Sequence, residues 1–180
     1  MSQLPSLPNS TATTLDVIEN MPIQALLDHF AAQGIEIKLP IDELGIIQNI
    51  RYLDINGGAN GKGEVMTEMA VDENAWFFRC HFPGDPIMPG CLGIEGMWQS
   101  IGAILAAKGH HGKLRALGIG GVKFFGEVRP TAKMVTFKIS IDRSLKNKQM
   151  IIAVASGSVE VDGEEIYRAE KLKVGVLFED

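Results

Sequence analysis

Several features that would mark whole classes of protein are missing from this sequence. Its only two cysteines, Cys80 and Cys91, cannot build a disulfide framework, and no CxxC pair offers a zinc site. No run approaches the roughly 20 apolar residues of a membrane helix. The N-terminus lacks the basic start and apolar core of a secretory signal. We therefore expect a cytoplasmic protein that does not span a membrane.

An excess of positive charge is missing too. The net charge is −5, which argues against nucleic acid as the main partner. Hydrophobic residues make up 46% and charged residues 22% of the 180-residue chain, as in a globular domain with a sizeable core. We find no internal repeat and no second composition regime, so a single folded domain is expected.

The chain divides into three stretches. Residues 1–13 are rich in Ser, Thr and Pro and are expected to be disordered. Residues 14–37 read as an N-terminal helical extension, with Pro22 at the start of the helix and Gly34 as its stop. Residues 38–180 form the main domain.

Within that domain, the hydrophobic pattern predicts one buried helix among antiparallel strands. Residues 92–108 are apolar nearly all round, which is typical of a helix enclosed by protein. Extended segments are expected at 35–40, 44–55, 64–71, 117–128 and 135–142, followed by a hairpin around Asp162–Gly163. The pattern indicates an α+β architecture, a sheet wrapped around a central helix. The sheet's free edges favour a dimer.

Candidate catalytic residues gather between 76 and 100. His81 follows the bulky run WFFRC and precedes the rigid turn FPGDP. A buried, neutral imidazole suits a general base, although a core histidine satisfied by a backbone carbonyl is an equally open interpretation. The other three histidines lie in surface patterns.

Glu95 is the only charged residue between Asp85 and Lys108. Burial in an apolar helix would favour its protonated form, as a general acid requires, unless it lies on an exposed edge. Gln99, one turn further on, could hydrogen-bond and orient this carboxyl.

Gly90 and Cys91 stand at the head of the apolar helix. Their N–H groups could polarise a carbonyl oxygen, or the segment could be a simple loop-to-helix junction. Cys80 is not expected to act with His81, because adjacent side chains on an extended chain diverge. His81, Asp85 and Glu95 lack metal-ligand spacing, so no metal site and no cofactor are predicted.

The segment WFFRCHFPGDPIMPGCLGIEGMWQ resembles the active-site segment of the 3-hydroxydecanoyl-acyl-carrier-protein dehydratase/isomerase family. The similarity continues through ALGIGGVKFFGEVRPTAKMVTFKI and VDGEEIYRAEKLKVGVLF, over roughly residues 38–178. It implies a hot-dog fold, in which an antiparallel sheet wraps a long central helix. It also implies a homodimer whose active sites combine residues of both subunits.

The resemblance implies a mechanism as well. His81 of one subunit would remove the C2 proton of a 3-hydroxyacyl thioester. Gly90 N–H would hold the thioester carbonyl, and Glu95 of the other subunit would help the C3 hydroxyl leave as water. Glutamate stands here where the isomerase family usually has aspartate, which favours dehydration over isomerisation.

The implied substrate arrives on acyl carrier protein, an acidic partner with a phosphopantetheine arm. Basic residues that could receive it are Arg143, Lys146, Lys148, Lys171 and Lys173, although an ordinary solvated strand edge would look the same. Two alternatives remain open: a hot-dog thioesterase, and a non-catalytic partner of an active dehydratase.

Overall fold

A computed structural model describes residues 15–178, so the expected disordered segment 1–13 lies outside the described residues. The strands are β1 (Val17–Pro22), β2 (Asn49–Asp54), β3 (Glu64–Ala70), β4 (Lys113–Gly118), β5 (Gly121–Phe124), β6 (Met134–Lys146), β7 (Met150–Val161) and β8 (Glu164–Leu177). The helices are α1 (Ile23–Ala31), α2 (Gly90–Ala107) and the short 3₁₀ turns η1 (Asp42–Leu44) and η2 (Trp76–Arg79).

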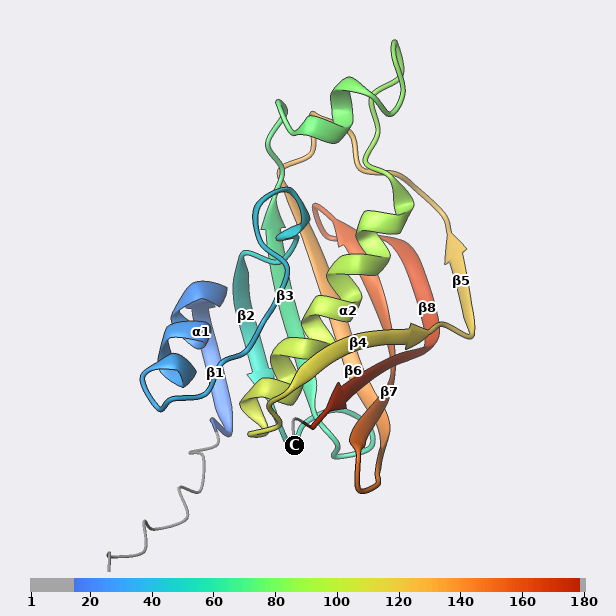
Figure 1. Cartoon of the computed structure of the whole chain (residues 1–180). Coiled ribbons are helices and arrows are strands. Elements are labelled where there is room, and N and C mark those ends of the chain that lie inside the picture. The colour runs from blue at the N-terminus through green and yellow to red at the C-terminus, as the bar shows by residue number, and fades with distance from the viewer. Residues whose placement is uncertain (1–14, 179–180) are drawn as a thin grey trace, which may run out of the picture.

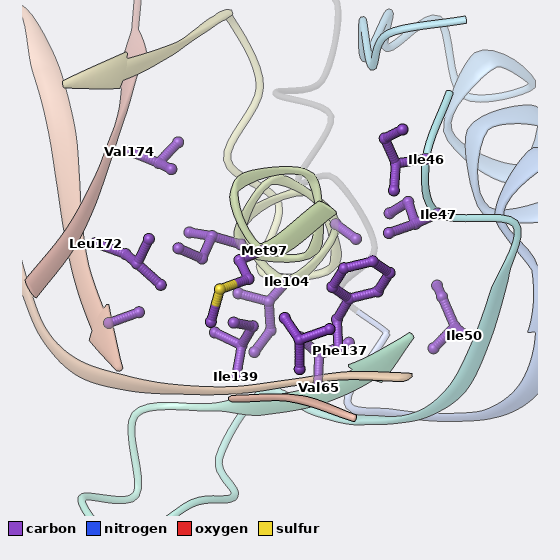
Figure 2. Packing of buried hydrophobic residues seen from close by; sticks show 14 of the residues in the cluster. Ile46, Ile47, Ile50, Val65, Met97, Ile104, Phe137, Ile139, Leu172 and Val174 are labelled. Carbon is purple, nitrogen blue, oxygen red and sulfur yellow. The ribbon is translucent and has the colours of Figure 1, made fainter. Parts of the chain in front are cut away.

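All eight strands belong to one antiparallel sheet, in the order β1-β2-β3-β6-β7-β8-β4, with β5 paired to β8. Figure 1 shows α2 running along one face of this curved sheet. Figure 2 looks along α2 and shows Met97 and Ile104 packed over Val65, Phe137 and Ile139 of the strands beneath. The expected α+β architecture with a central helix is therefore confirmed.

The sheet can enclose α2 because the strands alternate. In β6 every second residue from Val135 to Ile141 is buried, which is the period of a strand with one face against the core. Two buried hydroxyls in the same interface satisfy each other, with Thr67 Oγ1 and Ser100 Oγ 2.6 Å apart. The apolar pattern therefore defines the inner face, and this pair of buried hydroxyls is satisfied within it.

Close approach between α2 and the sheet depends on glycine. A methyl group at Gly96 would overlap the Phe137 ring, and one at Gly93 would overlap the Tyr167 ring. The glycines that weaken the helix in isolation thus allow aromatic rings of β6 and β8 to lie directly against its backbone.

The N-terminal extension is only partly helical. The expected helix is present as α1, with Pro22 at its N-cap, but residues 17–22 form the edge strand β1. This strand pairs with β2, from Val17 opposite Asp54 to Pro22 opposite Asn49. The strand at residues 17–22 was not expected, because its formation depends on a partner distant in sequence.

Other expected extended segments also need correction. Residues 35–40 form no strand, and the segment expected at 44–55 enters the sheet only at Asn49. The segment expected as one strand at 117–128 is divided: β4 ends at Gly118, β5 covers Gly121–Phe124, and both pair with β8. Glycines at 118, 120 and 121 interrupt it, and Gly118 has φ of 148°. The hairpin around Asp162–Gly163 is confirmed.

No helix within residues 15–178 combines the length and the apolar character that a membrane crossing requires.

We expect Gly96→Ala to lower the free energy of unfolding. Overpacking a core costs about 1–3 kcal/mol, whereas the gain in helix propensity is at most about 1 kcal/mol. Denaturant unfolding measures the difference. Gly121→Ala is the matched control, because no atom lies within 4 Å of the added methyl group. Equal stability of the two variants would contradict close packing at Gly96.

Candidate active site

His81 lies in a tightly bonded loop between η2 and α2. Phe77 and Phe78 of η2 are buried and anchor the start of this loop, and His81 N–H donates to the Phe77 carbonyl at 2.9 Å. A turn from Phe82 to Asp85 follows, and Ile87 N–H then donates back to the His81 carbonyl at 2.8 Å. The aromatic run that precedes His81 therefore fixes the position of its backbone.

The imidazole of His81 has a defined tautomer. Its Nδ1 lies 3.0 Å from the Ile87 carbonyl oxygen. A carbonyl oxygen can only accept, so Nδ1 carries the proton and Nε2 of the neutral ring is the basic nitrogen. His81 can therefore be both a histidine bonded to a backbone carbonyl and a general base. The carbonyl engages Nδ1, and Nε2 remains available to take a proton.

The head of α2 faces the same cavity as His81. Pro89 is the N-cap, and α2 begins at Gly90, so the first N–H groups of the helix lack intrahelical acceptors. His81, Gly90 and Cys91 all line a cavity of about 430 Å³. A side chain at Gly90 would press on the Phe124 ring, which also borders the cavity. The structure therefore brings a base and the positive end of a helix together.

Glu95 is held by Gln99, as the spacing along the helix suggested. Gln99 Nε2 donates to Glu95 Oε1 at 2.9 Å and to the Leu44 carbonyl at 2.6 Å. Gln99 Oε1 accepts from the N–H groups of Ile46 and Ile47 at 3.0 and 3.2 Å. With 3% exposure and four hydrogen bonds, the amide of Gln99 is fully used and fixes the carboxyl beside it.

Within one chain, Glu95 and His81 belong to different cavities. Glu95 opens on a separate cavity of about 320 Å³ between α2, the segment 38–40 and strand β4. Trp98, Gly102 and Leu114 make much of this second cavity apolar, while Lys38 and Arg115 add positive charge. A single chain therefore does not assemble His81 and Glu95 into one site.

Two residues of the His81 cavity escaped the sequence analysis. Tyr167 of β8 and Glu127 both line it, far along the chain from His81. Burial raises the pKa of Tyr167, and the electrostatic influence of Cys91 and Glu127 raises it further. Glu127 is itself ion-paired with Arg129. Tyr167 gave no local signal, because nothing in the sequence of β8 distinguishes it from the other buried residues of that strand.

The five basic residues proposed for carrier docking do not all lie in one row on the sheet. Arg143 and Lys173 both pair with Val154, so their side chains project from the same face of the sheet. That face is turned away from α2, because the neighbouring Val174 belongs to the core. Arg115 pairs with Gly175, two residues beyond Lys173, and so joins this outer row. Sequence reasoning missed Arg115.

The other three basic residues lie apart from that row. Lys171 is exposed at an irregular position of β8, with φ of 55°, next to Gly120. Lys146 is the last residue of β6 and lies three residues after Arg143, so the two side chains do not share a face. Its Nζ is 5.8 Å from the centroid of the Phe178 ring. Lys148 is in the β6–β7 turn, which Figure 1 places at the opposite end of the sheet from η2.

Cys80 is directed at backbone rather than at His81. Its Sγ lies 3.5 Å from the Phe77 carbonyl oxygen and 3.7 Å from that of Trp76. Within residues 15–178, no group of three His, Cys, Asp or Glu side chains is arranged to hold a metal ion.

Comparison with known proteins relates this architecture to a family. A family model described as FabA-like domain matches residues 39–170. The dehydratase heterocomplex ApeI:P from Xenorhabdus doucetiae aligns with a TM-score of 0.59 and 14% identity, over 89% of this chain and 93% of the other. A putative thioesterase, a phenylacetic acid degradation-related protein from Ralstonia eutropha JMP134, aligns with a TM-score of 0.53 and 13% identity, over 83% and 99%. The sheet and central helix therefore have the hot-dog fold.

We expect Gln99→Leu to lower the free energy of unfolding by at least about 2 kcal/mol. The variant leaves the N–H groups of Ile46 and Ile47 unsatisfied, and a buried unsatisfied group costs about 1–3 kcal/mol. Gln24→Leu is the control, because Gln24 is exposed and bonds only Asp28. An equal shift of the thermal unfolding midpoint in both variants would argue against stabilisation by the Gln99 hydrogen bonds.

Proposed function

This chain belongs to the FabA-like domain family, and we propose that it dehydrates 3-hydroxyacyl thioesters carried on acyl carrier protein, giving trans-2-enoyl thioesters. The observation that supports this reaction most directly is the cavity shared by His81 and the head of α2. A base with a free Nε2 and a set of helix N–H donors are the two elements needed to make and hold an enolate-like intermediate.

The elimination uses three groups in sequence. His81 Nε2 takes the C2 proton of the substrate, and the electron pair of that C–H bond shifts toward the thioester carbonyl. The N–H groups of Gly90 and Cys91 stabilise the charge on the carbonyl oxygen. Glu95 then gives a proton to the C3 hydroxyl. The C3–O bond breaks with loss of water, and the electron pair of the enolate forms the C2=C3 double bond. The reaction has no net change of oxidation state and requires no metal or redox cofactor.

A second copy of this chain would complete the site. His81 and Glu95 open on different cavities, so a catalytic pair needs Glu95 from a partner subunit. Strands β4 and β5 and the residues beside them expose apolar side chains suited to such a contact: Leu117, Ile119, Phe124 and Phe125. A two-fold homodimer would form two equivalent shared sites.

The glutamate favours simple dehydration. Compared with the aspartate usual in the dehydratase/isomerase family, Glu95 extends its carboxyl by one methylene, and a misplacement of about 1 Å can cost on the order of 100-fold in rate. Gln99 fixes that carboxyl, so it cannot readily adjust. We therefore favour the trans-2 product without conversion to the cis-3 isomer.

For carrier docking we propose the outer row of Arg143 and Lys173, extended by Arg115, with Lys171 exposed nearby on the same strand as Lys173. Arg115 also lines the cavity of Glu95, so it connects this surface with the site that the phosphopantetheine arm must reach. Lys146 and Lys148 lie beyond the row and would add longer-range attraction for an acidic carrier. The cytoplasmic location stays a prediction.

Product analysis with 3-hydroxydecanoyl-acyl carrier protein tests the reaction. We expect the wild type to give the trans-2-enoyl thioester alone. His81→Ala and Glu95→Gln should each lose about 100- to 10,000-fold in kcat, because each removes a proton-transfer group. A cis-3 product would refute the preference for dehydration alone. Free thiol release would instead indicate a thioesterase, and inactivity rescued only by a different chain would indicate a non-catalytic partner.

Mixing the two inactive variants serves as the control for a shared site. In a heterodimer of His81→Ala and Glu95→Gln, one site receives both intact groups. Random pairing in a two-fold dimer should therefore restore about a quarter of the wild-type activity. No recovery, with subunit exchange demonstrated, would exclude a site built from two chains.

Charge reversal tests the docking surface. Arg143→Glu and Lys173→Glu should raise KM for the carrier-bound substrate severalfold, with a smaller effect at high salt, and leave a small pantetheine thioester unaffected. Lys62→Glu is the control, since it makes the same charge change in the loop between β2 and β3, outside the row. Equal effects on both substrates would remove this surface from consideration.

A further inference from the structure

Tyr167 lines the His81 cavity, and its hydroxyl has no hydrogen-bond partner among residues 15–178. Its side chain is only 3% exposed and lines that cavity. In the part of the chain that the structure describes, no group hydrogen-bonds its oxygen. A phenol buried to this degree usually finds a partner, because an unpaired buried hydroxyl costs free energy.

The Tyr167 oxygen remains accessible from the cavity. Among residues 15–178, the fully enclosed side-chain polar atoms without a partner are Trp98 Nε1 and Ser140 Oγ. The Tyr167 oxygen is not one of them, although the rest of its side chain is covered. Because Tyr167 lines the cavity, a ligand bound there could accept the proton of this hydroxyl in a hydrogen bond.

The ring of Tyr167 is held firmly in this position. One side packs against Gly93 in the first turns of α2, where a methyl group would overlap the ring. Phe124 makes an edge-to-face contact with it, with ring centroids 4.6 Å apart and an interplanar angle of 82°. The hydroxyl is thus fixed near the head of α2 before any ligand binds, as an effective electrostatic donor must be.

We propose that Tyr167 is a further catalytic residue, whose hydroxyl donates a hydrogen bond to the thioester carbonyl oxygen alongside the N–H groups of Gly90 and Cys91. This assignment rests on the proposed dehydration. The carbonyl oxygen gains charge when His81 takes the C2 proton, so a donor fixed beside the helix head stabilises the enolate-like state more than the substrate.

The surroundings keep the phenol protonated. Burial raises the pKa of Tyr167, and the electrostatic influence of Cys91 and Glu127 acts in the same direction. The hydroxyl therefore stays neutral and able to donate at and above neutral pH. Glu127 is engaged with Arg129, so its carboxylate is already partnered.

Tyr167→Phe isolates the hydroxyl, because the ring and its contacts with Gly93 and Phe124 are retained. We expect kcat for dehydration to fall about 100- to 1,000-fold, the usual effect of losing one oxyanion donor, while KM and thermal stability change little. Tyr52→Phe is the matched control. Tyr52 is the other tyrosine of the chain, and its hydroxyl lies 3.5 Å from Asp54, outside both cavities.

A spectroscopic measurement separates this role from a structural one. A saturated decanoyl pantetheine thioester with a ¹³C-labelled carbonyl cannot be dehydrated, and its carbonyl stretch reports hydrogen bonding directly. We expect the bound frequency to be lowered in the wild type and in Tyr52→Phe, and to return toward the free value in Tyr167→Phe. The same frequency in wild type and Tyr167→Phe would overturn the assignment.

The two proposals fail in different ways. Loss of dehydration in His81→Ala with full kcat in Tyr167→Phe would reject the role of Tyr167 and leave the proposed function standing. Absence of dehydration in the wild type would reject the proposed function. The carbonyl frequency would still decide whether the hydroxyl binds the thioester oxygen.

Discussion

The close contact between α2 and the inner face of the sheet determines where the head of α2 and the cavity beside it lie. Gly93 and Gly96 allow the rings of Tyr167 and Phe137 to lie against the helix backbone. This contact sets the distance between α2 and the strands, and therefore the position of the first turns of α2. A bulkier helix would stand further from the sheet, and Gly90, Cys91 and Tyr167 would no longer border one cavity.

Polar groups in this interface are placed by hydrogen bonds rather than by packing. Gln99 uses every donor and acceptor of its amide, between Glu95 on one side and the backbone of residues 44–47 on the other. His81 is restrained in the same manner by the Ile87 carbonyl. Because leaving such groups unpaired is costly, their satisfaction also gives each candidate catalytic side chain a single orientation.

Much of the fold could be predicted because its signals are local. The hydrophobic patterns that predict α1, α2, β6 and the β7–β8 hairpin appear directly in the sequence. The four-residue spacing of Glu95 and Gln99 does too. Strand β1 could not be predicted, since its formation depends on pairing with β2. The break between β4 and β5 was missed as well, because glycines within an apolar run are compatible with either one strand or two.

By itself, the sequence determined which residues could perform the chemistry: a histidine after an aromatic run, an acid in an apolar helix, and glycine at the helix head. These choices depend on residue type and near neighbours, which the chain order contains. Only the tertiary structure decided which of them meet. It joined His81 to Gly90, Cys91 and Tyr167, assigned Glu95 to a separate cavity, and aligned Arg143 with Lys173. Strand pairing and helix packing bring together residues that lie far apart along the chain, and no local pattern specifies such contacts.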